Sequence, residues 1–400
     1  MKVCFETFGC RLNKAEALQM EAEYLAKGWL LTEKHSEADL FVVRGCSVTA
    51  RAQYACEKLI EHLKRHYPNV PIRVFGCLEK KNSDKFALLQ RKASRSAKEE
   101  VDSNDAESMG QAVPTRTARA YLKVQDGCSG KCSFCIVPKF RGSSVSEPFT
   151  ALMDKAKRFI ESGYHEIVVT GCNLSLFASE GKRLPELLVA LAGIDSSCRI
   201  RLGSLEPGAC ALETVHAMAE HSNICRFLHV PIQSGSSRIL TAMRRPYQIR
   251  EVDTLVTTAI KVMPKLGLGC DLMTGFPDES DIDFNMTKGL VTRVPFNNAH
   301  IFPYSERPGT VAATLCGVIP KKLRSVRAHE LAHITQDTRE RFAKTFIGKT
   351  VEIVVEDEEK VIGWTSEYLR CEAVGVVPRK AVAKIYVNRV MGDRLYGKLV

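Results

Sequence analysis

The sequence predicts an α/β protein in three parts: two parallel α/β regions and a small β-rich tail. Residues 1–80 alternate between short apolar strands and helices, and residues 121–302 repeat this alternation six times. From about residue 346, short β-rich pieces alternate with turns. Alternating strands and helices predict parallel sheets with right-handed crossovers. We therefore expect an N-terminal parallel α/β domain, a central partial (β/α)6 barrel or strongly curved sheet, and a C-terminal small β-barrel or sandwich.

The spacing of apolar residues places the individual elements. N-terminal strands are expected at 2–7, 40–43 and 72–75, with helices from residue 14 and over 50–66. Central strands are expected near 121–125, 166–170, 199–204, 227–230, 268–272 and 298–302, and helices near 151–162, 184–192, 211–220, 250–263 and 279–292. Tail strands are expected at 351–355, 381–387 and 395–399. The charged stretch 81–118 resembles a connector with a terminal helix or two, which gives domains at 1–113, 114–344 and 345–400.

Composition limits the class of protein. There is no apolar run long enough to span a bilayer, so no membrane partner is expected. The first residues, MKVCFE, lack the apolar core of a signal peptide, which predicts a cytoplasmic protein. The formal net charge of +11 suits a nucleic-acid partner, and it suits a basic enzyme without one equally well. Fifteen cysteines are many for a cytosolic chain, where disulfides are disfavoured, so their spacing must show which ones matter.

Three cysteines lie close together directly after the first central strand. Cys128, Cys132 and Cys135 have the spacing C-x3-C-x2-C, with Phe134 before the last of them. A structural zinc site normally has four ligands, and no fourth cysteine or histidine lies nearby in the sequence. Three thiolates in one loop fit a four-iron cluster with one open iron, which can chelate the amino and carboxylate groups of S-adenosylmethionine (SAM).

Three further cysteines follow the three N-terminal strands. Cys10, Cys46 and Cys77 are each preceded by glycine at the expected end of a strand. The carboxyl ends of parallel strands lie along one edge of the sheet, so these distant residues can converge. The spacing therefore predicts either a second iron–sulfur cluster or three ordinary cysteines of an α/β domain.

The C-x3-C-x-aromatic-C segment resembles the radical SAM superfamily, and this resemblance implies reductive cleavage of SAM to a 5′-deoxyadenosyl radical. The segments GCRLN around Cys10, CSVT from Cys46 to Thr49 and GC at Gly76-Cys77 resemble the methylthiotransferase family, and this resemblance covers nearly the whole chain. That resemblance implies two 4Fe-4S clusters, SAM, replacement of C–H by C–S–CH3, and a tail barrel of the TRAM type. Sulfur associated with the second cluster would be methylated by one SAM.

Central segments resemble the family's SAM-facing turns. They are VTGCN (169–173), RLGSLEP (201–207), HVPIQSGS (229–236), DLMTGFP (271–277) and FPYSERPGT (302–310). The resemblance implies cofactor contacts by Phe134, Gly171, Asn173, Ser204, Glu206, Gln233 and Asp271, and glycines there let the backbone approach a ligand. Simple turn roles for these residues are equally compatible with the pattern. The chain departs from the family at Arg44-Gly45, Gly203 and Cys172, where Asn-Thr, Ser, and Gln or Ile are usual.

Three segments resemble the branch that acts on N6-threonylcarbamoyladenosine at position 37 of tRNA. They are KVQDGC (123–128), SVTARA (47–52) and GWTSEYLR (363–370). The resemblance implies tRNA contacts by Tyr368, Arg370 and Arg389, a flavodoxin or ferredoxin as electron donor, and a monomeric enzyme. Other possible functions are a sister methylthiotransferase acting on N6-isopentenyladenosine in tRNA or on an aspartate of a ribosomal protein, a radical SAM enzyme of different chemistry, and a non-catalytic iron–sulfur RNA-binding protein.

Overall fold

The computed structural model describes residues 1–81, 117–357 and 359–400. These residues form two compact units. The first contains the N-terminal residues together with 127–129 and 135–143, and the second contains the rest of the chain from Thr117. The expected connector and the expected boundary between residues 113 and 114 lie outside the described residues. No described helix is long and apolar enough to cross a membrane.

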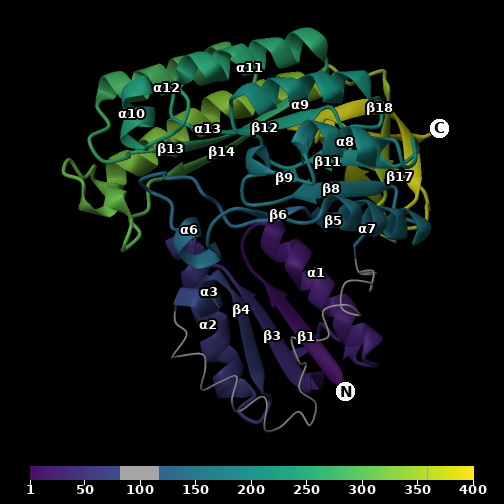
Figure 1. Ribbon diagram of the computed structural model, residues 1–400. Helices are drawn as coiled ribbons and strands as arrows, with labels where there is room; N and C mark the ends of the chain where they lie inside the picture. The colour runs from purple at the N-terminus through teal and green to yellow at the C-terminus, as the bar shows by residue number, and fades with distance from the viewer. Residues whose placement is uncertain (82–116, 358) are drawn as a thin grey trace. The chain divides into compact units, whose positions relative to one another are not determined.

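The first unit is a four-stranded parallel sheet between helices (Figure 1). Its strands, in the order β2-β1-β3-β4, are β1 (Lys2–Thr7), β2 (Leu30–Leu31), β3 (Leu40–Gly45) and β4 (Ile72–Gly76). Its helices are α1 (Arg11–Ala26), α2 (Ala50–His66), α3 (Cys77–Lys81) and α6 (Val137–Arg141). Val3 and Val42 belong to one apolar cluster with Tyr24 of α1, while Phe41 and Val43 belong to another with Ile60 of α2. This alternation confirms strands that are buried on both faces.

The second unit contains six parallel strands, each found where the sequence predicted one. They are β5 (Ala120–Lys123), β8 (Glu166–Thr170), β11 (Arg199–Leu202), β12 (Phe227–Gln233), β13 (Gly267–Thr274) and β14 (Asn298–Pro303). They pair as β5-β8-β11 and β12-β13-β14, and the parallel bridges Ile200–Ile224 and Ser204–His229 connect the two halves. The connecting helices are α7 (Phe149–Glu161), α8 (Leu184–Ala192), α9 (Ala209–Glu220), α10 (Ser237–Ala242), α11 (Ile249–Val262) and α12 (Asp281–Arg293). The predicted partial (β/α)6 barrel is confirmed.

Short elements complete this unit. The small pairs are β6 (Gln125–Asp126) with β7 (Val145–Ser146), and β9 (Ala178–Ser179) with β10 (Lys182–Arg183); η2 is Leu174–Leu176 and η3 is Val311–Thr314. The 24-residue helix α13 (Lys321–Lys344) was not predicted. Its buried side includes Arg324 and Arg327, which bind backbone carbonyls and carboxylates, so the helix lacks a clear apolar stripe.

The tail forms one five-stranded sheet in the order β15-β18-β19-β17-β16. The strands are β15 (Thr350–Val354), β16 (Val361–Trp364), β17 (Arg370–Val374), β18 (Val382–Met391) and β19 (Arg394–Leu399). The N–H of Glu356 donates to the carbonyl of Ile362 at 2.9 Å, which brings the two edge strands together and nearly closes the sheet. The sequence predicted β15, β18 and β19 but missed β16 and β17. A division between residues 344 and 345 stays our proposal, because the tail belongs to the same compact unit as the barrel.

A buried ionic network joins the barrel strands to the tail. Glu166 and Arg201 are fully buried, and Nε of Arg201 lies 2.7 Å from Oε1 of Glu166. Arg199 pairs with the same carboxylate. Arg201 also donates to the carbonyls of Thr365 and Ser366 at 2.9 and 3.1 Å. Burial alone would raise the pKa of Glu166, but the charges of Arg201 and Arg199 outweigh burial and hold it well below its ordinary value.

Glu166→Gln should destabilise the second unit by about 3–5 kcal/mol, because it leaves buried guanidinium groups without their counter-charge. Denaturant unfolding followed by circular dichroism measures the change. Glu213→Gln is the matched control, since its ion pair with Arg183 is about half exposed and should contribute little to stability. Equal losses in the two variants would contradict a special role for the buried network.

Candidate active site

The three N-terminal cysteines lie at the carboxyl ends of adjacent strands. Cys10 precedes α1, Cys46 follows β3, and Cys77 begins α3 after β4. Burial raises the pKa of the Cys46 thiol, and the neighbouring thiols of Cys10 and Cys77 raise it further. The structure therefore brings these three residues close enough for electrostatic interaction. This is the convergence of the three cysteines that the sequence predicted.

Glycine makes this convergence possible. Gly9 and Gly76 adopt φ values of +97° and +91°, a region that L side chains rarely occupy. A Cβ added at Gly9 would lie 2.8 Å from Sγ of Cys46, and one at Gly76 would lie 2.7 Å from the carbonyl oxygen of Gly45. A side chain at either position would therefore push the cysteine loops apart.

Polar contacts to Cys56 and Cys77 hold the backbone of the Cys46 loop in place. The N–H of Cys46 donates to Sγ of the fully buried Cys56 at 3.4 Å. The hydroxyl of Ser47 donates to the carbonyl of Cys77 at 2.9 Å, so the second and third cysteine loops are joined directly. These contacts hold the cysteine loops in fixed positions, as the binding site of an iron–sulfur cluster requires.

Arg44, one of the departures from the family pattern, has a partner of its own. It pairs with Glu16 of α1, which also lies 3.0 Å from Arg141 of α6. Arg141 donates to Oδ1 of Asn13 at 2.7 Å, and Asn13 in turn donates to the carbonyls of Phe8 and Gly45 at 2.8 and 3.3 Å. One polar network thus joins the turns that carry Cys10 and Cys46. Sequence analysis missed Glu16 and Arg141, because only the fold places them there.

Cys128, Cys132 and Cys135 occupy the loop after β6, and all three are half-buried. Gly127 has a φ of +66°, and a Cβ there would lie 2.0 Å from the carbonyl oxygen of Ser143. The N–H of Cys128 donates to the carbonyl of Gly142 at 3.0 Å. The loop therefore has a fixed backbone from which its thiols can serve as ligands.

The middle of this loop, residues 130–134, belongs to the second unit. The N–H of Ser133 donates to the carbonyl of Met243 at 2.9 Å, and its hydroxyl donates to the carbonyl of Ala242 at 2.9 Å. Phe134, expected to contact the cofactor, packs beside the buried cluster that contains Met273 and Tyr304. That contact role stays a prediction.

A charged group lies beside Cys132. Nη1 of Arg245 is 3.1 Å from Sγ of Cys132, and Nη2 is 2.5 Å from Oε1 of Glu206. Oε2 of Glu206 accepts from the amide of Asn173 at 2.8 Å. Burial would lower the pKa of Arg245, but nearby Tyr247 and Glu206 raise it above its ordinary value, so the guanidinium stays charged. The structure thus brings together the predicted residues Asn173 and Glu206, and adds Arg245 and Tyr247, which the sequence analysis missed.

Gln233 offers an unused polar atom at the end of β12. Its side chain is 7% exposed, its φ is +75°, and Oε1 has no hydrogen-bond partner. A buried acceptor without a partner is costly, which indicates a place for a ligand donor. Gly171 and Gly203 leave no room for side chains: a Cβ at Gly171 would lie 2.9 Å from Gln125, and one at Gly203 would lie 3.1 Å from Leu174. These residues fit an amino-acid-bearing cofactor such as SAM, and the six cysteines fit two 4Fe-4S clusters.

One other departure, Cys172, and two other predicted contacts, Ser204 and Asp271, can also be placed. Cys172 donates to Oδ1 of Asp126 at 3.6 Å and is half-buried. Ser204 forms a parallel bridge with His229. Asp271 binds two imidazoles, with Oδ1 lying 3.0 Å from Nε2 of His229 and 3.1 Å from Nδ1 of His300. Cofactor contacts by Ser204 and Asp271 stay predictions.

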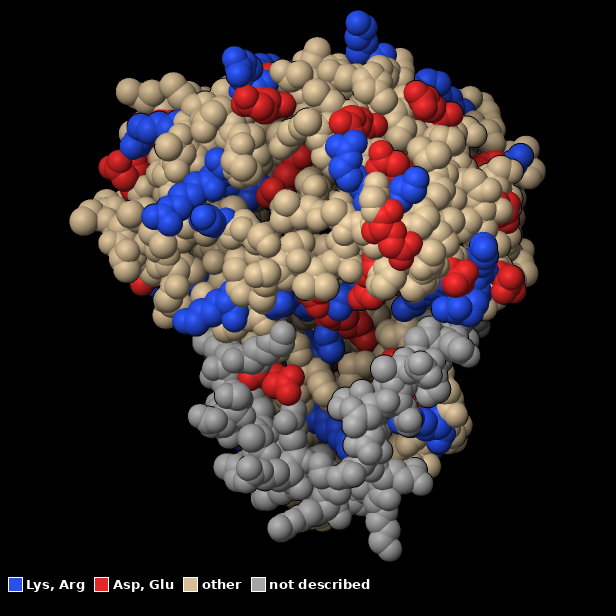
Figure 2. All heavy atoms as spheres, in the orientation of Figure 1, with Lys and Arg blue, Asp and Glu red and all other residues tan. Residues whose placement is uncertain are grey.

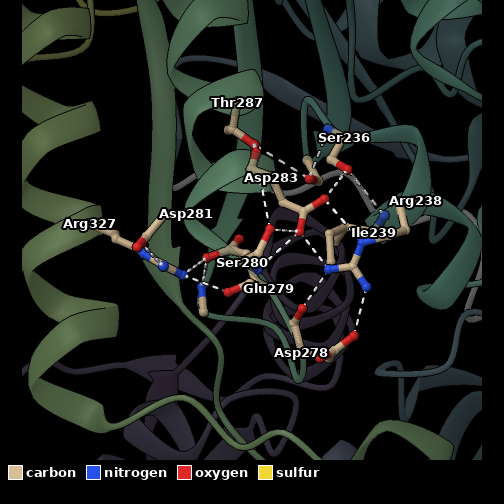
Figure 3. Close-up of polar contacts among 12 residues, drawn as sticks. Ser236, Arg238, Ile239, Asp278, Glu279, Ser280, Asp281, Asp283, Thr287 and Arg327 are labelled. Atoms are coloured by element: carbon tan, nitrogen blue, oxygen red, sulfur yellow. Dashed lines mark hydrogen bonds and ion pairs between the residues drawn. The ribbon is translucent and has the colours of Figure 1, made fainter.

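The loop after β13 is held by a network of arginines and carboxylates (Figure 3). Arg238 of α10 lies 2.6 Å from Asp278 and 2.5 Å from Asp283. Arg327 of α13 lies 2.6 Å from Glu279, whose carboxylate also accepts from the N–H of Gly275 at 2.8 Å. The helices α10, α12 and α13 therefore fix the Gly275 turn at the carboxyl end of β13.

The tail residues expected to contact tRNA have different environments. Tyr368 stacks on Trp364 and Phe227 at ring distances of 4.4 and 4.6 Å, which gives it a packing role between tail and barrel. Arg370 pairs with Glu356, whereas Arg389 is exposed and lies 5.2 Å above the ring of Tyr396. A base-stacking role for Tyr368 stays a prediction that these contacts do not favour.

Comparison with known proteins agrees with this arrangement. Residues 122–291 match the radical SAM superfamily, and residues 2–95 match the uncharacterized protein family UPF0004. The threonylcarbamoyladenosine tRNA methylthiotransferase MtaB of Thermotoga maritima is 30% identical, over 93% of this chain and 91% of the relative. The tRNA-2-methylthio-N(6)-dimethylallyladenosine synthase of Methylacidiphilum infernorum is also 30% identical, over 90% of this chain and 85% of the relative.

A solved structure supports the fold independently of close sequence similarity. The radical SAM methyltransferase TsrM of Kitasatospora setae, solved with cobalamin and a 4Fe-4S cluster, matches with a TM-score of 0.55 at 13% identity. The match covers 78% of this chain and 77% of that one. Together with the two cysteine triads, the full-length sequence matches show that the chain is a transferase of the radical SAM methylthiotransferase family.

Proposed function

We propose that the chain methylthiolates C2 of N6-threonylcarbamoyladenosine at position 37 of tRNA. The reaction class rests on one observation: two separate cysteine triads, one in glycine-preceded turns after three parallel strands and one in the single loop after β6. The substrate rests on the segments KVQDGC, SVTARA and GWTSEYLR. The alternative substrate is N6-dimethylallyladenosine, since relatives named for each substrate are 30% identical to this chain.

The protein's own residues hold and orient the reacting groups. Cys128, Cys132 and Cys135 would hold one 4Fe-4S cluster, and Cys10, Cys46 and Cys77 would hold the other. When bound, the clusters and SAM supply the radical chemistry and the methylthio group. Arg245 keeps a positive charge beside Sγ of Cys132, and Glu206 and Asn173 present polar groups for SAM. A flavodoxin or ferredoxin would deliver electrons to the monomer in the cytoplasm.

The exposed side of the tail hairpin offers a surface for RNA. In the register of β18 and β19, Tyr386 pairs with Lys398 and Arg389 pairs with Tyr396. Tyr386 is 46% exposed. Aromatic rings interleaved with basic groups suit nucleotide stacking and phosphate contacts. On the face of the second unit seen in Figure 2, basic and acidic side chains are interspersed, so the net charge of +11 forms no continuous basic field there.

Mass spectrometry of nucleosides tests the substrate. Reduced enzyme, reconstituted without oxygen, is incubated with SAM and with tRNA carrying either modified adenosine. We expect a 2-methylthio product from the threonylcarbamoyl tRNA only. A product from the dimethylallyl tRNA alone would overturn the proposed substrate and keep the reaction class.

Cys46→Ala should abolish methylthiolation and leave cleavage of SAM to 5′-deoxyadenosine, because it removes a ligand of the second triad only. Both products are measured in the same incubation. Cys316→Ala is the matched control, since Cys316 is exposed and belongs to neither triad. Full methylthiolation by the Cys46 variant would overturn the assignment of the second cluster.

Replacing both Arg389 and Lys398 by Ala should weaken tRNA binding and reduce the slope of log affinity against log salt by about 2, because two phosphate contacts are lost. Filter binding over a range of salt concentrations measures the slope. The control replaces Lys157 and Lys261, on the outer helices α7 and α11, by Ala. An unchanged slope in the Arg389 and Lys398 variant would exclude the hairpin surface as a tRNA contact.

A further inference from the structure

Two histidines and an aspartate form a polar cluster on three adjacent strands. His229 belongs to β12, Asp271 to β13 and His300 to β14. Oδ1 of Asp271 lies 3.0 Å from the ring of His229 and 3.1 Å from the ring of His300, and the two rings are 5.1 Å apart. Neither cysteine triad includes any of these three residues, and of the three only Asp271 was predicted to contact the cofactor.

The cluster faces the inside of the barrel. Phe227 and His229 are two residues apart on β12, so they share a face of the sheet. The ring of Phe227 stacks on Tyr368, and the Arg201 guanidinium lies 5.3 Å from the centre of the same tyrosine ring. Arg201 comes from β11 and Phe227 from β12, so Tyr368 of the tail packs against the inner face of both strands. The tail thus closes the barrel at the amino ends of the strands, and the histidine cluster lies on the same inner face, nearer the carboxyl ends.

His300 is the member of the cluster that a ligand can reach. Its side chain is 60% exposed, against 8% for His229 and 26% for Asp271. It belongs to β14, the terminal strand of its sheet as described. Because Nδ1 is directed at Asp271, the other ring nitrogen, Nε2, remains for a ligand.

The carboxylate of Asp271 interacts with both histidine rings. Burial would raise the pKa of Asp271, but hydrogen bonds from His229 and His300 outweigh burial and hold it below its ordinary value. The carboxylate therefore stays ionised and fixes the orientation of both imidazoles. Nε2 of His300 can then accept from a hydroxyl or N–H when the ring is neutral, and can donate to a carboxylate when the ring is protonated.

We propose that His300, oriented by Asp271 and His229, recognises the polar N6 substituent of the target adenine through that substituent's carboxylate and hydroxyl groups. This inference rests on the proposed function and names the residue that would select its substrate. A threonylcarbamoyl group carries both a carboxylate and a hydroxyl, whereas a dimethylallyl group has neither. A site built for hydrogen bonds rejects an analogue that lacks them, because its polar atoms are left unpaired.

The experiment compares two tRNA stem-loops, one with N6-threonylcarbamoyladenosine and one with the methyl ester of the same group. The wild type should prefer the free acid. His300→Leu should lower kcat/KM on the acid about tenfold or more, mainly through KM, and leave the ester unchanged, since a charge-assisted hydrogen bond is lost. His300→Gln should retain part of the preference because an amide can still donate. His216→Leu, at an exposed position on α9, is the control and should behave as the wild type.

The possible outcomes separate the two proposals. A wild type that methylthiolates acid and ester equally, or a His300→Leu variant that loses both equally, overturns the recognition role and leaves the proposed function intact. A wild type that modifies only dimethylallyl tRNA overturns the proposed substrate itself. Metal analysis adds a third arm: a stoichiometric divalent ion present in the wild type and lost in His300→Leu would make the cluster a metal site and overturn recognition.

Discussion

The parallel direction of the strands is the constraint on which the N-terminal cysteine triad depends. Parallel strands place all their carboxyl ends at one edge, so a residue after each strand meets residues that are distant in sequence. In the first unit this brings Cys10, Cys46 and Cys77 together, provided that Gly9 and Gly76 allow their loops to touch. In the second unit the same rule brings Asn173 and Glu206 together.

Polar contacts then fix the positions of the loops that carry these residues. Glu16 and Asn13 join the cysteine turns of the first unit, and Arg245 joins Cys132 to Glu206 in the second. Such partners orient ligands that would otherwise rotate freely, and they limit the reorganisation that cofactor binding requires. The loop after β13 follows the same plan, because arginines from α10 and α13 hold its carboxylates.

The tail packs against the barrel and contributes to its structure. Arg201 and Glu166 are fully buried, and Arg201 donates to the backbone carbonyl of Thr365 in the tail. Separating the tail from the barrel would therefore be costly, because it would break a buried charged network. Tyr368 accordingly packs against Phe227, whereas Tyr386 and Arg389 of the tail stay exposed. The histidine cluster of β12, β13 and β14 lies apart from these contacts.

The sequence by itself determined the parallel α/β plan and the six barrel strands, and it singled out the six cysteines of the two triads. It could do so because apolar periodicity and cysteine spacing are local signals. It missed α13, whose buried side carries arginines in place of an apolar stripe, and the short strands β16 and β17. Only the tertiary structure decided which polar residues meet: Arg245 with Cys132, Glu16 with Arg44, and His300 with Asp271. Those pairs depend on side chains that converge from separate strands and helices, and no local pattern encodes that convergence.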